Sequence, residues 1–146
     1  MLRTVQHSHP LLGSLRGRVL DNDVVQFRGI PFARIPARFR QSRLADQLSP
    51  QELDCTEYSY VCPQQPQEYD AFGGRLPDDH EYRHDELRCL NLTVSAPRQA
   101  LSGSALRGNS TIPVLVYVHG GGFARGANVG GLNGICLSLN VLQGPW

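Results

Sequence analysis

The chain has 146 residues, enough for one domain with a hydrophobic core of ordinary size. Its hydrophobic fraction of 40% and charged fraction of 18% are typical of a globular protein. The net charge of +1 gives no reason to expect nucleic acid or an anionic membrane as a partner. No apolar run has the length of a signal peptide core or a membrane span, so we expect no membrane partner, and secreted and cytoplasmic locations both stay open.

The N-terminal part predicts a β-hairpin. Residues 15–20 and 24–27 are short β-prone runs, and the polar turn Asp21-Asn22-Asp23 between them has hairpin length. Pro31 lacks an N–H group, so we expect it to exclude a central strand and to make the chain leave in an extended conformation.

Residues 34–88 show no sustained helical or strand period. Such a long loop-like stretch is uncommon inside a compact domain and is easier to understand packed over a larger body. Residues 89–94 then alternate apolar and polar side chains, which predicts a strand ending near Pro97. A Gly/Ser/Asn linker follows over residues 101–111.

Residues 112–118 form a continuous apolar run rich in β-branched side chains. A run without alternation is typical of a strand buried on both faces, as in a mostly parallel sheet. We therefore expect a buried strand that leads directly into His119-Gly120-Gly121-Gly122-Phe123.

Consecutive glycines at the end of a rigid strand suit an oxyanion hole. Acyl-transfer enzymes stabilise a negative oxygen with main-chain N–H groups, and a carbonyl oxygen approaches those groups closely only where no Cβ intrudes. A plain glycine turn and a phosphate-binding loop are the alternatives. The glycines at 120, 121, 122 and 126 fit neither common phosphate-loop spacing.

Five motifs in order resemble the type-B carboxylesterases, the family that includes the cholinesterases. They are Gly17-x-Val19 with Val25-x-Phe27-x-Gly29-Ile30-Pro31-Phe32-Ala33, then Arg38-Phe39, Cys62-Pro63-Gln64, Glu86-Leu87-Arg88-Cys89-Leu90-Asn91-Leu92 and the segment from Pro113 to Phe123. The Cys-Leu-Asn-Leu form is similar to fungal members. The resemblance covers residues 15–126 and leaves residues 1–14 and 127–146 as unassigned tails.

The resemblance implies an α/β fold, namely the incomplete N-terminal portion of an α/β-hydrolase with short antiparallel strands, long loops and one buried strand before the oxyanion loop. It implies that Gly121 and Gly122 are oxyanion donors and that Cys62 and Cys89 form a disulfide, with two buried thiols as the alternative. It places no partner for Cys55 or Cys136. It implies no cofactor, and a small-molecule carboxylic ester as the substrate of the intact family.

The serine nucleophile of that family has no counterpart in these residues. No Ser has Gly at both −2 and +2, no Asp or Glu follows Glu86, and His119 is the only later histidine. We therefore expect no catalytic residue and no ester turnover by this chain alone, as in a truncated fragment. A non-catalytic remnant or binding protein is the alternative.

A distant alternative is a zinc-dependent hydrolase, because His80-Glu81-Tyr82-Arg83-His84 matches H-E-x-x-H. Its flanks are charged and offer no apolar face to bury a helix, so a solvated turn is favoured and we expect no metal. The cysteine spacings match no zinc pattern. Of two glycosylation sequons, Asn91-Leu92-Thr93 lies in an expected strand and is interpreted as structural.

Overall fold

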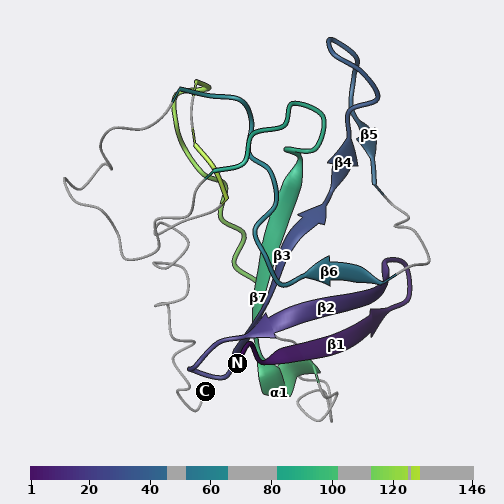
Figure 1. Ribbon diagram of the computed structural model, residues 1–146, viewed down its shortest axis with the longest axis vertical. Helices are drawn as coiled ribbons and strands as arrows, with labels where there is room; N and C mark the ends of the chain where they lie inside the picture. The colour runs from purple at the N-terminus through teal and green to yellow at the C-terminus, as the bar shows by residue number, and fades with distance from the viewer. Residues whose placement is uncertain (46–51, 66–81, 102–112, 125, 129–146) are drawn as a thin grey trace, which may run out of the picture.

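A five-stranded sheet forms the main body of the protein, in a computed structural model that describes residues 1–45, 52–65, 82–101, 113–124 and 126–128 (Figure 1). Four strands lie in the order β1-β2-β3-β7, and β6 pairs with β2. A separate two-stranded ladder joins β4 to β5. The strands are β1 (Thr4–His9), β2 (Gly13–Val19), β3 (Val24–Pro31), β4 (Ala33–Arg34), β5 (Arg43–Leu44), β6 (Leu53–Cys55) and β7 (Asn91–Pro97), and one short helix, α1 (Arg98–Leu101), follows β7.

The predicted hairpin is confirmed as the antiparallel pair β2–β3. Its turn is closed by the Leu20 N–H, which donates to the Val24 carbonyl at 2.8 Å. Asp23 takes a positive φ of 59° there, a conformation that Asp tolerates better than most residues. Residues 21–23 therefore form the hairpin turn that the sequence predicted.

The prediction that Pro31 excludes a central strand was wrong. β3 lies between β2 and β7 and continues through Ile30 to Pro31, which pairs with Asn91. A register shift between Phe27 and Ile30 makes this possible, and Gly29 sits within it at a φ of 68°. Pro31 is the last residue of the strand, where the missing N–H costs least.

Two strands in the sheet had no sequence signal. β1 lies within the N-terminal residues left unassigned above, and it pairs with β2 from Thr4 opposite Arg18 to His9 opposite Gly13. β6 lies within the long loop-like stretch and pairs in parallel with the middle of β2, from Leu15 opposite Leu53 to Gly17 opposite Cys55. The strand predicted over residues 89–94 is confirmed as β7, which begins at Asn91.

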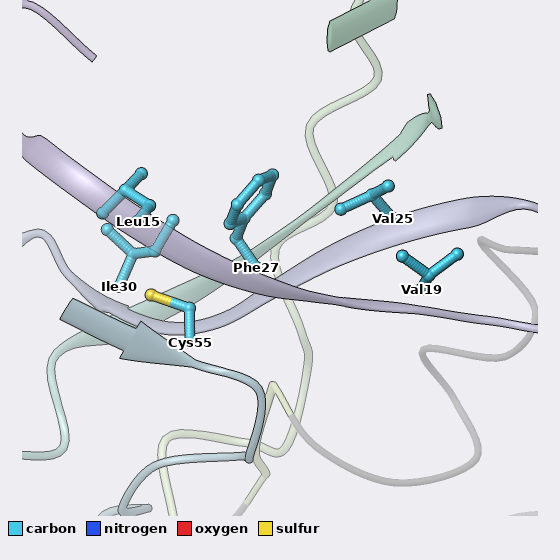
Figure 2. Close-up of a cluster of buried hydrophobic side chains, with 6 residues drawn as sticks. All are labelled: Leu15, Val19, Val25, Phe27, Ile30 and Cys55. Carbon is cyan, nitrogen blue, oxygen red and sulfur yellow. The ribbon is translucent and has the colours of Figure 1, made fainter. Parts of the chain in front are cut away.

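The hydrophobic core lies where β2, β3 and β6 meet. Figure 2 shows Leu15, Ile30 and Cys55 together at one end of the cluster, Phe27 in the middle and Val19 and Val25 at the other end. Each of the six side chains is at most 6% exposed. Because the core draws on residues from 15 to 55, the loop-like stretch takes part in it through Cys55.

Within the described residues, no helix has the length and apolar character needed to cross a membrane. The antiparallel strands and long loops that the sequence predicted are present.

Candidate functional site

The apolar run before the glycine motif is not a buried strand. Residues 113–118 pair with no strand in the described part of the chain, and they run outside the sheet (yellow-green in Figure 1). Val114, Val116 and Val118 are 83%, 77% and 82% exposed. A strand buried on both faces needs neighbours along both edges and layers above and below it. The described residues provide neither, so the sequence prediction of a buried strand was wrong for this chain.

The glycine motif forms an exposed turn. Gly121 and Gly122 have φ values of 138° and 61°, which favour glycine, and Phe123 follows at 60°. The Ala124 N–H donates to the Gly121 carbonyl at 3.1 Å and closes the turn. Among the described residues, the N–H groups of Gly121 and Gly122 have no acceptor, and both residues are exposed. The turn can therefore offer two adjacent amides to an anionic oxygen.

A Cβ added at Gly122 would meet no atom within 4 Å. Steric crowding within the described residues therefore does not explain glycine at this position. The positive φ of 61° favours glycine there.

Gln64, from the Cys-Pro-Gln motif, holds the far end of this loop. Its Nε2 donates to the Gly126 carbonyl at 2.9 Å, and the Gly126 N–H donates to its Oε1 at 2.8 Å. The side chain thus satisfies both polar groups of one residue that lies 62 positions away. The Cys-Pro-Gln motif therefore contacts the residues that follow the glycine motif through a pair of hydrogen bonds.

Asn91 provides a second connection to the loop. Its side chain is buried and donates to the Tyr60 carbonyl at 2.8 Å and to the Arg88 carbonyl at 3.2 Å. The Nδ2 of Asn128 in turn donates to the Asn91 carbonyl oxygen and to its Oδ1, both at 3.0 Å. Asn91 therefore has a structural role in this chain, in agreement with the interpretation of its sequon.

Arg38 and Glu86 join two further motifs. The Arg38 guanidinium binds the Glu86 carboxylate at two points, at 2.8 and 2.9 Å. The Arg38 and Glu86 side chains are 67% and 42% exposed, so we assign the pair a role in geometry rather than a large stabilising energy. The guanidinium carbons of Arg83 and Arg88 lie over the ring of Tyr60, at 4.9 and 4.0 Å from its centroid.

Cys62 and Cys89 are free thiols in this structure and not a disulfide. The Cys89 thiol donates to the Glu86 carbonyl at 3.6 Å. Burial, together with the neighbouring Cys62 thiol, raises the pKa of Cys89 to about 11. Cys55 is a third free thiol, fully buried in the core, and Cys136 lies outside the described residues. The pairing of Cys62 with Cys89 stays a prediction.

The H-E-x-x-H motif does not have the geometry of a zinc helix. His84 forms a parallel β-bridge with Val61 and lies in no helix. Its Nδ1 is 3.2 Å from the Cys62 carbonyl oxygen. His80 and Glu81 lie outside the described residues. Because the spacing places two imidazoles on one face only in a helix, the zinc interpretation loses its structural basis.

The family comparison decides where this arrangement belongs. The model of the carboxylesterase family matches residues 3–140, nearly the whole chain. The chain belongs to the carboxylesterase family. The match begins before the first motif recognised above and extends beyond Gly126, where the recognised resemblance ended.

Several carboxylesterase relatives are similar to this chain. Lipase 1 of Yarrowia lipolytica is 31% identical over 134 residues, which cover 91% of this chain and 24% of the relative. Acetylcholinesterase of Bungarus fasciatus is 33% identical over 122 residues, or 79% of this chain and 18% of the relative. Among solved structures, a thermophilic pNB esterase superposes with a TM-score of 0.59 at 29% identity, over 83% of this chain and 22% of the esterase.

The chain thus spans about a quarter of the length of the curated relatives it matches first. Its structure is similar to part of an α/β-hydrolase esterase. The sequence placed Gln64 in a motif without a role and interpreted Asn91 as structural, but it could not name their partners, because these lie far away in the chain. Asn128 had no signal at all, since it falls in a tail without periodicity.

Proposed function

We propose that this chain provides the oxyanion-binding portion of a carboxylic ester hydrolase. The observation that carries the proposal is the exposed pair of amides at Gly121 and Gly122, which have no acceptor among the described residues and lie inside a segment that the carboxylesterase family model matches. The relatives named lipase and esterase support a small-molecule carboxylic ester as the substrate class.

The chemistry of the two amides follows from where charge develops in the reaction. Attack on an ester carbon moves an electron pair onto the carbonyl oxygen, and two N–H donors held in place stabilise that negative oxygen. The backbone at Gly121 and Gly122 is shaped before the ester arrives, so no reorganisation is needed at that moment. In this proposal the chain supplies the electrophilic part of the site.

The nucleophilic part is absent from these 146 residues. No Ser has glycine at both −2 and +2, and no acid follows Glu86. Loss of the nucleophile costs about as much activity as loss of the entire triad in the serine hydrolases that have been dissected. We therefore expect the chain to be inactive toward esters by itself.

A non-catalytic binding role is the second candidate, and the exposed segment 113–118 favours it. Contiguous apolar side chains at the surface are typical of an interaction site. The two candidates predict different results when the chain is combined with the rest of a carboxylesterase.

The test of the oxyanion role combines this chain with a thermophilic pNB esterase that lacks the part matched here, and follows p-nitrophenyl ester turnover. An amide-to-ester replacement at Gly122 removes one N–H and keeps the backbone shape. We expect it to lower kcat by about 10²–10³ in the restored enzyme. The same replacement at Gly120, which is not a proposed donor, is the matched control and should have little effect.

Equal rates with and without the Gly122 N–H would refute the oxyanion role. The chain alone should show only background hydrolysis and should form no adduct with an organophosphate. Serine-type turnover by the chain alone would refute the statement that the nucleophile is absent.

A further inference from the structure

We infer that Gln64 is a positioning residue, which sets the direction of the Gly121 N–H by fixing Gly126. The inference rests on the proposed function of the glycine turn, and it assigns a task to a side chain that does not touch the substrate. Gln64 is half-buried and is separated from the turn by a long stretch of sequence.

The contact between Gln64 and Gly126 fixes an orientation as well as a position. A single hydrogen bond would leave the Gly126 residue free to turn about that bond. Here the carboxamide donates to the Gly126 carbonyl at 2.9 Å and accepts from the Gly126 N–H at 2.8 Å. Two antiparallel bonds to the same residue remove that rotation.

Gly126 in turn contacts the peptide group that carries the proposed donor. Its φ is 118°, and a Cβ added there would collide with the Gly120 carbonyl oxygen and with the His119 ring. Its Cα is therefore packed directly against that oxygen. The Gly120 carbonyl and the Gly121 N–H belong to one planar peptide unit, so the direction of one determines the direction of the other.

Gln64 itself stands on a fixed support. Val61, three residues earlier, is buried, and its N–H and carbonyl bond to Arg83 and Asp85 at 2.9 and 3.1 Å. The Gln64 Nε2 also lies 3.3 Å from the Cys62 carbonyl oxygen and donates to it. The support, the carboxamide, Gly126 and the turn thus form one continuous chain of contacts.

Amide hydrogen exchange by NMR on the full 146-residue chain tests this inference. The Ala124 N–H, which closes the turn by bonding to Gly121, does not contact Gln64 and therefore reports the turn itself. Gln64→Ala removes both hydrogen bonds to Gly126 and the one to the Cys62 carbonyl, and we expect the Gly126 and Ala124 amides to exchange roughly tenfold faster. Amides in β2 and β3 should keep their rates. Gln6→Ala is the matched control, because the hydrogen bonds of the Gln6 side chain to described residues go to Ser14 and Glu52, and it should leave the turn unchanged.

Three results would overturn the inference. The first is an unchanged Gly126 rate, and the second is a faster Gly126 with an unchanged Ala124. The third is equal acceleration of the turn and of the β2–β3 amides, which would make Gln64 a general support of the fold. If Gln64→Ala does not fold, Gln64→Glu decides, since it keeps the size but cannot donate to the Gly126 carbonyl; failure of both variants to fold counts as the third result. No ester is present in this experiment, so its failure leaves the Gly122 replacement test of the proposed function unaffected.

Discussion

Replacing Gly17 by alanine should destabilise the sheet, because β2 and β3 leave no room for a side chain there. A Cβ at Gly17 would lie 2.8 and 2.9 Å from two ring carbons of Phe27 and 3.0 Å from the Gln26 carbonyl oxygen. The ring is only 3% exposed and is enclosed by the core, so it has little space to move away. Overpacking of this kind costs about 1–3 kcal/mol.

A smaller effect acts in the opposite direction. Exchanging glycine for alanine restricts the unfolded chain and contributes about 0.4–1 kcal/mol of stability where the backbone conformation suits alanine. Gly17 has no positive φ that would forbid alanine. The net loss should therefore be about 1–2 kcal/mol.

Urea unfolding followed by circular dichroism measures this loss. With a denaturant slope of about 2 kcal/mol per M, the midpoint should fall by about 0.5–1 M. Combining Gly17→Ala with Phe27→Leu should cost less than the sum of the two single changes, by at least about 0.5 kcal/mol, because the smaller side chain accommodates the new methyl. Gly120→Ala, which places its Cβ in open space, is the matched control. An unchanged midpoint for Gly17→Ala, or strict additivity in the double variant, would refute the packing argument.

Three further predictions follow from the cysteines and the exposed segment. Burial raises the pKa of the Cys55 thiol to about 11 from an ordinary 9.0, so the folded chain keeps a proton that the unfolded chain loses. This contribution to stability is complete below pH 9 and is lost as the pH rises toward 11. Between pH 9 and 11 the urea midpoint should therefore fall less steeply with pH in Cys55→Ala than in the unmodified chain. Equal slopes would contradict the raised pKa of Cys55. Oxidation should link Cys62 to Cys89, and mass spectrometry should show the cross-linked peptide. Closing this loop should add roughly 3–4 kcal/mol of stability. A disulfide through Cys55 would contradict the pairing of Cys62 with Cys89. Val116→Lys should reduce aggregation in light scattering and change the unfolding free energy by less than about 0.5 kcal/mol, whereas a large loss would show that Val116 is buried.

The hairpin and β7 could be predicted because their signals are local. Alternation over residues 89–94 and a polar turn at 21–23 depend only on neighbouring residues, and the structure contains both elements. The family could also be recognised from the sequence, since its motifs occur in order along the chain, and the family model confirms it.

The pairing of distant segments was decided only by the tertiary structure. β6 is three residues long and exists because Leu53 and its neighbours find an open edge on β2, which no local pattern specifies. The contact of Gln64 could not be predicted for the same reason, because its partner Gly126 lies 62 residues away. It also explains the error at 113–118. An apolar run expresses a tendency to be buried, but burial requires neighbouring strands, and within the described residues that segment has none.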